Sequence, residues 1–359
     1  MALPFFASAT KRKRDQMLAI DLGGRKTKAV HLQRRSDGFA LCRYALLDAP
    51  VSEKGLSVNL VSEHLKAVCL ALETKTKFVT LALGVDDALV RNLEMPRMQV
   101  EDTRQILRVN SRNFLQQDLA DHVFDCWLMP VKRQPKKPGE AAKSPSETQK
   151  NKVLVTGAKQ QLIDDLQTAI KNAGLVADRV IPGLIGPANA FEMALPEVFA
   201  KETVALVDLG FKHSTICILQ EGDLVLSRVV AIGGDRLTTS LAETMGISYL
   251  EAEGIKVGMA AEVESTLEPL LVTLGRELRA SIDFFEHQQD KPISHVYFSG
   301  GSARSEFIVA MLQVELVVEC KTWNPATFLQ MALPPHQAAE IDAIAPQLTV
   351  AIGAAAAEF

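Results

Sequence analysis

Two kinds of segment alternate along most of this chain. Short apolar runs bounded by Gly, Pro or Asp predict buried strands, and longer stretches with apolar residues three and four apart predict amphipathic helices. In the first half we expect helices at residues 61–74, 101–117, 160–173 and 187–194. The strands expected there are residues 17–21, 27–33, 39–47, 77–83, 89–94, 122–129, 152–156 and 176–180. Alternating strands and helices of this kind predict an α/β protein.

The pattern of the first strands recurs in the second half of the chain. Residues 18–32 read LAIDLGGRKTKAVHL, and residues 204–220 read VALVDLGFKHSTICILQ. Both predict a buried strand, an Asp-x-Gly turn and a second strand, and a hairpin partner follows at residues 224–231. Internal duplication is fold information. Two copies facing each other would place their Asp-x-Gly turns on opposite walls of one cleft.

Composition narrows the class of protein. The chain has 359 residues, 47% of them hydrophobic, which predicts two to three domains with packed cores. Its five cysteines are scattered and contain no Cys-x-x-Cys pair, so neither a zinc site nor a disulfide framework is expected. The net charge of −4 gives no basic footprint for nucleic acid, and no apolar window is long enough for a transmembrane segment.

Two segments differ in composition from the rest. Residues 131–151 are rich in Pro, Lys, Ser and Glu, which predicts a disordered loop; a partner-docking arm is the alternative. Residues 1–15 predict a flexible tail whose basic residues 11–14 would alternatively contact anionic lipid.

The two Asp-x-Gly turns carry the strongest chemical signal. Asp21 and Gly23 form the first turn, and Asp208 and Gly210 form the second. Glycine permits a tight turn and a close approach of backbone N–H groups to phosphate oxygens. An aspartate at a strand end suits Mg²⁺, which prefers oxygen ligands and keeps part of its water shell. A single copy would only predict a hairpin turn, whereas two copies predict a nucleotide site with Asp21 and Asp208 holding Mg²⁺ through water.

Three further elements fit a nucleotide. Gly233 and Gly234 precede a helix and would let the backbone approach the ligand at the floor of the cleft. A strand expected at residues 294–299 leads into a turn of small residues that leaves room for adenosine: Gly300, Gly301, Ser302 and, at its end, Arg304. Glu253 and Lys256 lie on one helix face, although in isolation a solvated ion pair is the simpler explanation for them.

In this order along the chain, the elements resemble the actin/chaperone/hexokinase ATPase superfamily, and within it the PilM proteins, with FtsA next. The stretch SRVVAIGGDRLTTSLAETMGISYLEAEGIKVG at residues 227–258 is the closest match, joined by VRNLEMP at 90–96, RELRASIDFFEHQQ at 276–289 and TVAIGAAAAEF at 349–359. The resemblance implies an actin-like, ribonuclease H-like fold of two lobes, with duplicated five-stranded sheets and an inserted small α+β subdomain. It places lobe I at residues 16–84 and 176–202, the insertion at 85–175, lobe II at 203–345 and a helix returning to lobe I at 346–359.

The resemblance also implies ATP and Mg²⁺ as ligands and adds residues to the site: Thr27, Lys28, Ser214 and Thr215. The chain departs from the family pattern at Arg25 and Lys26, which would contact phosphate or point to solvent. Phe211 stands where small residues are typical. Chaperone relatives carry an acidic residue where this chain has Thr215, so we expect slow or absent ATP hydrolysis.

Three functions follow from this resemblance. A PilM-like protein would be a cytoplasmic assembly scaffold of a type IV pilus or type II secretion-like machine, peripheral to the inner membrane. It would dock the N-terminal cytoplasmic peptide of a PilN-like membrane protein and could self-associate. The alternatives are a small-molecule kinase of the same superfamily, for which no sugar-like pocket is evident, and an FtsA-like cell-division protein, which usually ends in an amphipathic helix.

Overall fold

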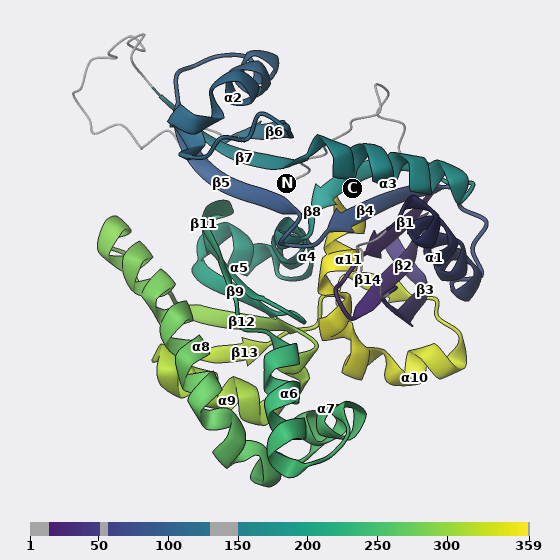
Figure 1. The fold of residues 1–359 in the computed structure, drawn as a ribbon, viewed down its shortest axis with the longest axis vertical. Helices are drawn as coiled ribbons and strands as arrows, with labels where there is room; N and C mark the ends of the chain where they lie inside the picture. Colours follow the sequence, from purple (N-terminus) through teal and green to yellow (C-terminus); the bar gives the residue numbers. More distant parts are fainter. Residues whose placement is uncertain (1–13, 51–56, 130–149, 358–359) are drawn as a thin grey trace.

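Two mixed sheets built on the same strand plan dominate the computed structural model, which describes residues 14–50, 57–129 and 150–357 (Figure 1). In each sheet an antiparallel meander of three strands is extended by strands parallel to its first strand. In chain order the first sheet contains β1 (Gln16–Asp21), β2 (Lys26–Arg35), β3 (Gly38–Asp48), β4 (Phe78–Leu83), β8 (Val176–Pro182) and β14 (Leu329–Met331). The second contains β9 (Thr203–Leu209), β10 (Ser214–Gln220), β11 (Asp223–Val230), β12 (His295–Gly300) and β13 (Cys320–Thr322). The predicted duplication and actin-like fold are confirmed.

Nearly every residue of the first strand in each sheet is buried, because helices cover both faces. On β1, Leu18 and Ile20 pack into an outer core with α1 (Val58–Ala71) and α3 (Gln160–Asn172). The outer core of the second lobe is formed with α6 (Gly234–Met245), α7 (Tyr249–Gly258), α8 (Ala260–Gln289) and α9 (Glu306–Leu316). No helix in these described ranges is both long and apolar enough to cross a membrane.

A central core joins the two lobes. Helices α4 (Gly186–Ala194) and α11 (Thr349–Ala356) cross between the sheets, in the middle of Figure 1. The crossing is close enough that a Cβ at Gly353 would collide with the carbonyl oxygen of Gly186. The buried Asn189 side chain also donates to the Gly353 carbonyl at 3.2 Å. This tight crossing ties the C-terminal helix to the first lobe.

A three-stranded sheet with its own small core forms the inserted subdomain. It contains β5 (Ala88–Met95), β6 (His122–Leu128) and β7 (Asn151–Lys159), covered by α2 (Val100–Leu115). We expected the insertion to extend through residue 175. Helix α3, however, packs its apolar face into the core beneath the first sheet, so we place the end of the insertion at β7.

The chain returns to the first lobe earlier than residue 346. Strand β14 pairs in parallel with β3, which gives the first sheet a sixth strand where we expected five. Helix α10 (Pro335–Ile344) follows, and its Gln337 side chain donates to the Tyr44 carbonyl of β3 at 2.9 Å. Residues 329–344 therefore accompany the first lobe, not the second.

Two predicted segments fall largely outside the described residues. Of the loop expected at residues 131–151, only 150 and 151 are described, and Asn151 already begins β7. Of the tail expected at residues 1–15, Arg14 and Asp15 are described. The Arg14 guanidinium stacks 3.6 Å above the Phe78 ring and binds the Asp178 carboxylate at 3.0 and 3.2 Å, so the flexible tail cannot extend through residue 14.

Candidate functional site: a polar cleft between the lobes

Equivalent strand ends from the two lobes bring two carboxylates within electrostatic reach of each other, at the place where we predicted the cleft. Asp21 ends β1, and Asp208 is the penultimate residue of β9. The residue opposite Asp21 in its hairpin is Lys28, and the residue opposite Asp208 is Thr215. Lys28 and Thr215 thus hold equivalent positions in the duplicated frame, with a cation on one wall and a hydroxyl on the other.

Lys28 lies between the two carboxylates. Its ammonium Nζ donates to Asp21 Oδ2 at 2.9 Å. Burial disfavours the charged ammonium, but Asp21 and, more weakly, Asp208 outweigh it and raise the pKa of Lys28 above its ordinary value. The lysine therefore stays protonated and neutralises part of the negative charge that the two aspartates bring together.

The ionised form of Asp208 is disfavoured in this arrangement. Burial raises the pKa of its carboxyl, and the charge of Asp21 adds to that effect. A hydrogen bond from Ser299 and the charge of Lys28 act in the opposite direction without cancelling it. A carboxylate kept in such a setting is typical of a site that binds a cation or a charged ligand.

Ser299 is a site residue that we did not predict. It lies beside Asp208 in the parallel pairing of β12 with β9, is 1% exposed, and its hydroxyl donates to Asp208 Oδ1 at 2.8 Å. The equivalent position in the first lobe is Ala82, which has no hydroxyl to offer Asp21. The sequence does show a serine directly before Gly300. That this serine binds Asp208, however, follows only once β12 is known to lie beside β9.

The glycine loops of the second lobe pack tightly against one another. The Gly234 N–H donates to the Gly210 carbonyl at 2.9 Å, joining the predicted floor of the cleft to the second Asp-x-Gly turn. A Cβ at Gly234 would lie 2.6 Å from Ser302 Oγ and 3.3 Å from Lys256 Nζ. Gly300 has a φ of +94°, and a Cβ there would strike the Leu209 carbonyl. These elements, distant in sequence, form one surface.

A buried network supports this surface from behind. Lys256 is 2% exposed, and its Nζ donates to Glu253 Oε2 at 2.8 Å, Thr238 Oγ1 at 2.8 Å and the Gly234 carbonyl at 3.4 Å. Burial lowers the pKa of Lys256, opposed by the Glu253 charge. Burial alone would raise the pKa of Glu253, but Lys256 holds it below its ordinary value. The solvated ion pair that we weighed is thus excluded, and Thr238 joins Glu253 and Lys256.

Two predicted site residues, Thr27 and Ser214, have their hydroxyls bonded elsewhere, and Lys26 takes the solvent-facing one of the two orientations that we left open. The Thr27 hydroxyl lies 2.8 Å from His64 Nε2 on α1, because successive strand residues point to opposite faces and Lys28 takes the cleft side. The buried Ser214 hydroxyl donates to the Ile232 carbonyl at 2.7 Å. Lys26 pairs with Asp48 at 2.9 Å on the surface of the first lobe, and Arg304 is exposed.

The remaining loop residues line the two walls. Gly23 lies beside Lys28, so a Cβ there would be 2.5 Å from the ammonium. Gly24 faces the other lobe: a Cβ there would be 3.2 Å from the Phe211 ring. Gly233 packs against the Phe211–His213 backbone, and Gly301 has open space around it. The two loops therefore approach each other directly across the cleft.

The residues present fit a Mg²⁺–nucleotide pair. Asp21 and Asp208 supply oxygen donors, and the Lys28 ammonium supplies positive charge for phosphate oxygens. Within the described part of the chain no group of three or more His, Cys, Asp or Glu could hold a metal ion by itself. Mg²⁺ suits a site with few carboxylates, because it takes its other ligands from water and substrate phosphates.

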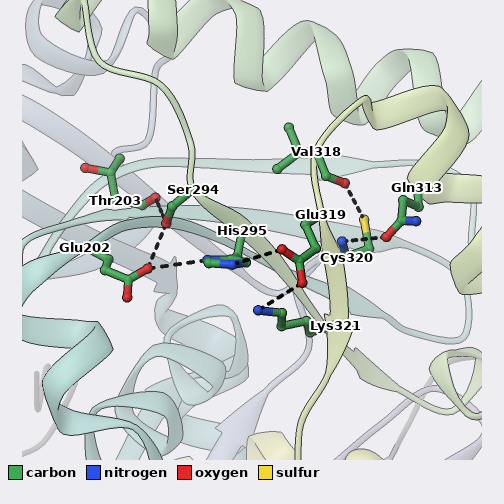
Figure 2. A network of polar contacts seen from close by, with 9 residues as sticks. All are labelled: Glu202, Thr203, Ser294, His295, Gln313, Val318, Glu319, Cys320 and Lys321. Atoms are coloured by element: carbon green, nitrogen blue, oxygen red, sulfur yellow. Dashed lines mark hydrogen bonds and ion pairs between the residues drawn. The ribbon is translucent and has the colours of Figure 1, made fainter.

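A second polar network lies at the opposite end of β12 (Figure 2). His295 begins the strand, with Nδ1 3.4 Å from Glu202 Oε2 and Nε2 3.3 Å from Glu319 Oε2, while Lys321 pairs with Glu319. The Ser294 hydroxyl also donates to Glu202 at 2.9 Å. The Glu319 side chain is 62% exposed, and the full length of β12 separates this network from Gly300. We therefore interpret the network as a structural link between neighbouring strand ends and not as part of the cleft.

Comparisons with known proteins agree with this fold. The PilM of a structure titled "PilM-PilN type IV pilus biogenesis complex" has a TM-score of 0.81 and 20% identity over 96% of this chain and 98% of its own. EutJ, the ethanolamine utilization protein of Carboxydothermus hydrogenoformans, has a TM-score of 0.56 and 15% identity over 96% and 91%. MreB5 of Spiroplasma citri, solved bound to ADP, has a TM-score of 0.51 and 10% identity over 88% and 94%. At these identities the likeness establishes the fold.

Sequence comparison identifies the family. Cell division protein FtsA of Bacillus subtilis is 30% identical over 103 residues, which cover 29% of this chain but only 22% of the length of FtsA. A family model described as type IV pilus assembly protein PilM matches residues 139–359, more than half of the chain. The chain is therefore a member of the PilM family of type IV pilus assembly proteins.

Proposed function

We propose that this chain is an ATP-binding assembly scaffold of a type IV pilus or type II secretion-like machine. It binds ATP with Mg²⁺ between its lobes, hydrolyses it slowly or not at all, and docks the N-terminal cytoplasmic peptide of a PilN-like inner-membrane protein. The observation that carries the nucleotide part is the meeting of the Asp21–Lys28 pair with Asp208 and Ser299 across one cleft.

The chemistry of the cleft favours a phosphate ligand bound with a divalent cation. Lys28 supplies positive charge for phosphate oxygens, while Asp21 and Asp208 supply oxygen ligands that would hold Mg²⁺ through its water shell. A cation placed there would relieve the mutual repulsion of the two carboxylates. MreB5, which shares the fold, was solved with ADP and so supports a nucleotide in this cleft.

Slow ATP hydrolysis is expected because Thr215, in the hairpin after β9, supplies no general base for the attacking water. Thr215 is 5% exposed and lies opposite Asp208 in the sheet, at the position where chaperone relatives carry an acidic residue. Phosphoryl transfer depends on a positioned nucleophile and on charge stabilisation. A threonine hydroxyl cannot serve as a general base at neutral pH, so we assign ATP the role of a ligand that sets lobe closure.

The inserted subdomain offers an edge for an extended peptide. Strand β6 is an outer strand of the three-stranded sheet, so one side of its backbone is available for pairing. Trp127 on β6 is 41% exposed and lies opposite Leu154, which packs into the central core. Trp127 therefore lies on the sheet face turned toward the lobes, where an extended, semi-apolar peptide would find both backbone partners and an aromatic contact.

Family membership and the similarity to a PilM solved with PilN support this partner class. We accordingly place the protein in the cytoplasm, held at the inner membrane by its partner. Self-association is compatible with this role.

A peptide pull-down tests the scaffold role. Immobilised N-terminal peptides of membrane-spanning pilus and secretion proteins from the same genome would be incubated with the full chain, with and without MgATP. We expect one peptide class to retain the protein in a nucleotide-dependent way, and Trp127→Ala to weaken retention. Val109, which is 81% exposed on the adjacent helix α2, provides the matched control Val109→Ala. No retention of the wild type by any peptide would contradict the scaffold role.

A further inference from the structure

A side chain of the first lobe reaches across to two aromatic rings of the second lobe. Arg25 belongs to the turn between β1 and β2, and its guanidinium carbon lies 4.5 Å from the centre of the Tyr249 ring. The same carbon lies 6.0 Å from the centre of the Phe211 ring. Both rings belong to the second lobe. A cation over an aromatic face is attracted by the ring quadrupole, so this contact holds the lobes together.

The contact is anchored on both sides. On the first lobe, the Arg25 carbonyl accepts a hydrogen bond from the Ala49 N–H at 2.8 Å. On the second lobe, the Tyr249 hydroxyl donates to Asp235 Oδ1 at 2.9 Å, and the Asp235 N–H donates to the Phe211 carbonyl at 2.9 Å. The two rings are therefore parts of one fixed platform, and the Arg25 side chain is the movable member.

Arg25 also lies within electrostatic reach of Glu253 on α7. After the larger effects of burial, Lys256 and Thr238, its charge helps to keep the pKa of Glu253 low. Burial, and then the neighbouring Asp235, raise the pKa of Tyr249, so the ring stays protonated and neutral. The guanidinium is thus attracted both to the ring face and to the Glu253 carboxylate.

A second contact between the lobes involves the same Asp-x-Gly loop of the second lobe but a different turn of the first. Asp86, in the turn after β4 of the first lobe, has its Oδ2 3.2 Å from Nδ1 of His213 in the second Asp-x-Gly loop. The residues that make these contacts include Arg25 and Phe211, the departures from the small-residue pattern of related loops. The bulky side chains at those positions therefore join the two lobes across the cleft.

We propose that Arg25 is a latch that holds the two lobes closed over the cleft and slows the release of nucleotide. Separation of the guanidinium from Tyr249 would let the lobes open and a ligand between them leave. The proposal rests on the nucleotide site proposed above for its effect on release, whereas its effect on lobe closure stands without a ligand.

Two measurements test the latch. The first is stopped-flow release of a fluorescent ATP analogue, chased with excess MgATP. Arg25→Ala should accelerate release about three- to tenfold, the range expected for one partly buried cation–π contact, and Arg25→Lys should lie in between. Lys26→Ala is the matched control, because Lys26 pairs with Asp48 inside the first lobe. It should release nucleotide at the wild-type rate.

The second measurement needs no nucleotide. Spin labels are attached at two exposed positions, Lys66→Cys on α1 and Glu243→Cys on α6. Double electron–electron resonance spectroscopy then measures the distribution of distances between the lobes. The partly exposed Cys42, Cys69 and Cys320 would first be replaced by serine. Arg25→Ala should broaden the distribution toward longer distances, and Lys26→Ala should leave it unchanged.

The outcomes separate the latch from the nucleotide site. A wild-type chain that takes up no nucleotide refutes the proposed site, and the distance distribution alone then decides the latch. An unchanged distribution in Arg25→Ala overturns the latch, as does an unchanged release rate where nucleotide binds. Loss of binding by Arg25→Ala with an unchanged distribution would make Arg25 a direct ligand contact and would also overturn it.

Discussion

The Lys28 ammonium lies 2.9 Å from the Asp21 carboxylate, and the same lysine is within electrostatic reach of Asp208 on the other lobe. One cation therefore links the two walls of the cleft. The duplicated frame explains its position, because Lys28 stands opposite Asp21 as Thr215 stands opposite Asp208. The two walls share one strand plan, and the pairing of Lys28 on one with Thr215 on the other makes them electrostatically different.

Asp208→Asn should stabilise the ligand-free protein at neutral pH. The folded-state pKa of Asp208 is raised above its ordinary value of 3.8, chiefly by burial, so its cost to stability grows as the pH rises above 3.8 and is complete above the raised value. We expect the free energy of unfolding in urea to rise by about 0.5–2 kcal/mol at pH 7.

The gain should shrink as the pH falls toward 3.8, because Asp208 is then protonated in both the folded and the unfolded state. Asp118→Asn, at an exposed position, is the control and should change stability little at any pH. A loss of stability in Asp208→Asn at pH 7 would contradict this account of the site.

Ser299→Ala should weaken MgATP binding by about two- to tenfold, the effect of losing one hydrogen bond. The Ser299 hydroxyl orients the Asp208 carboxylate and opposes the rise in its pKa. Isothermal titration calorimetry measures the affinity. Ser294→Ala removes a hydroxyl at the opposite end of β12 and should bind as the wild type does. Equal affinity of the two variants would remove Ser299 from the site.

Lys256→Met should lower the free energy of unfolding by roughly 2–4 kcal/mol, because it leaves Glu253, Thr238 and a backbone carbonyl without their donor. Lys201→Met is the control: Lys201 pairs with Glu197 on the surface, with 71% of its side chain exposed, and its loss should cost less than about 0.5 kcal/mol. Urea unfolding distinguishes the two. Similar small losses in both variants would show that the Lys256 network is solvated after all.

Gly234→Ala should be destabilising, although alanine favours a helix start. The new Cβ would lie 2.6 Å from Ser302 Oγ and 3.3 Å from Lys256 Nζ, and overpacking of this kind costs about 1–3 kcal/mol. Gly301→Ala adds the same methyl group where nothing lies within 4 Å. A thermal melt of the two variants should show a loss for the first and little change for the second; the reverse order would contradict the packing described for the floor of the cleft.

Local sequence patterns predicted the sheets because apolar runs and Asp-x-Gly turns are local signals. The hairpin β10–β11, for example, was expected at residues 214–220 and 224–231 and is found at Ser214–Gln220 and Asp223–Val230. Strand alternation alone would also have shown that only one of Thr27 and Lys28 can face the cleft, because neighbouring residues on a strand point to opposite faces.

The contacts missed by sequence reasoning are set by tertiary packing. Ser299 finds Asp208 only once β12 is known to lie beside β9, and Arg25 finds Tyr249 only once the two lobes close. Strand β14 is three residues long and joins a sheet whose other strands lie far earlier in the chain. None of these pairings leaves a periodic pattern in the sequence.

The most direct test of a Mg²⁺–nucleotide cleft is a calorimetric titration of MgATP into the wild type and into Asp208→Asn. The asparagine variant keeps the shape of the side chain and should be folded, so a change in affinity reports on the carboxylate. We predict saturable binding by the wild type, an affinity at least about tenfold weaker in the variant, and turnover below ~1 s⁻¹ in the same samples. Equal affinity of both proteins, or no binding by the wild type, would contradict the account.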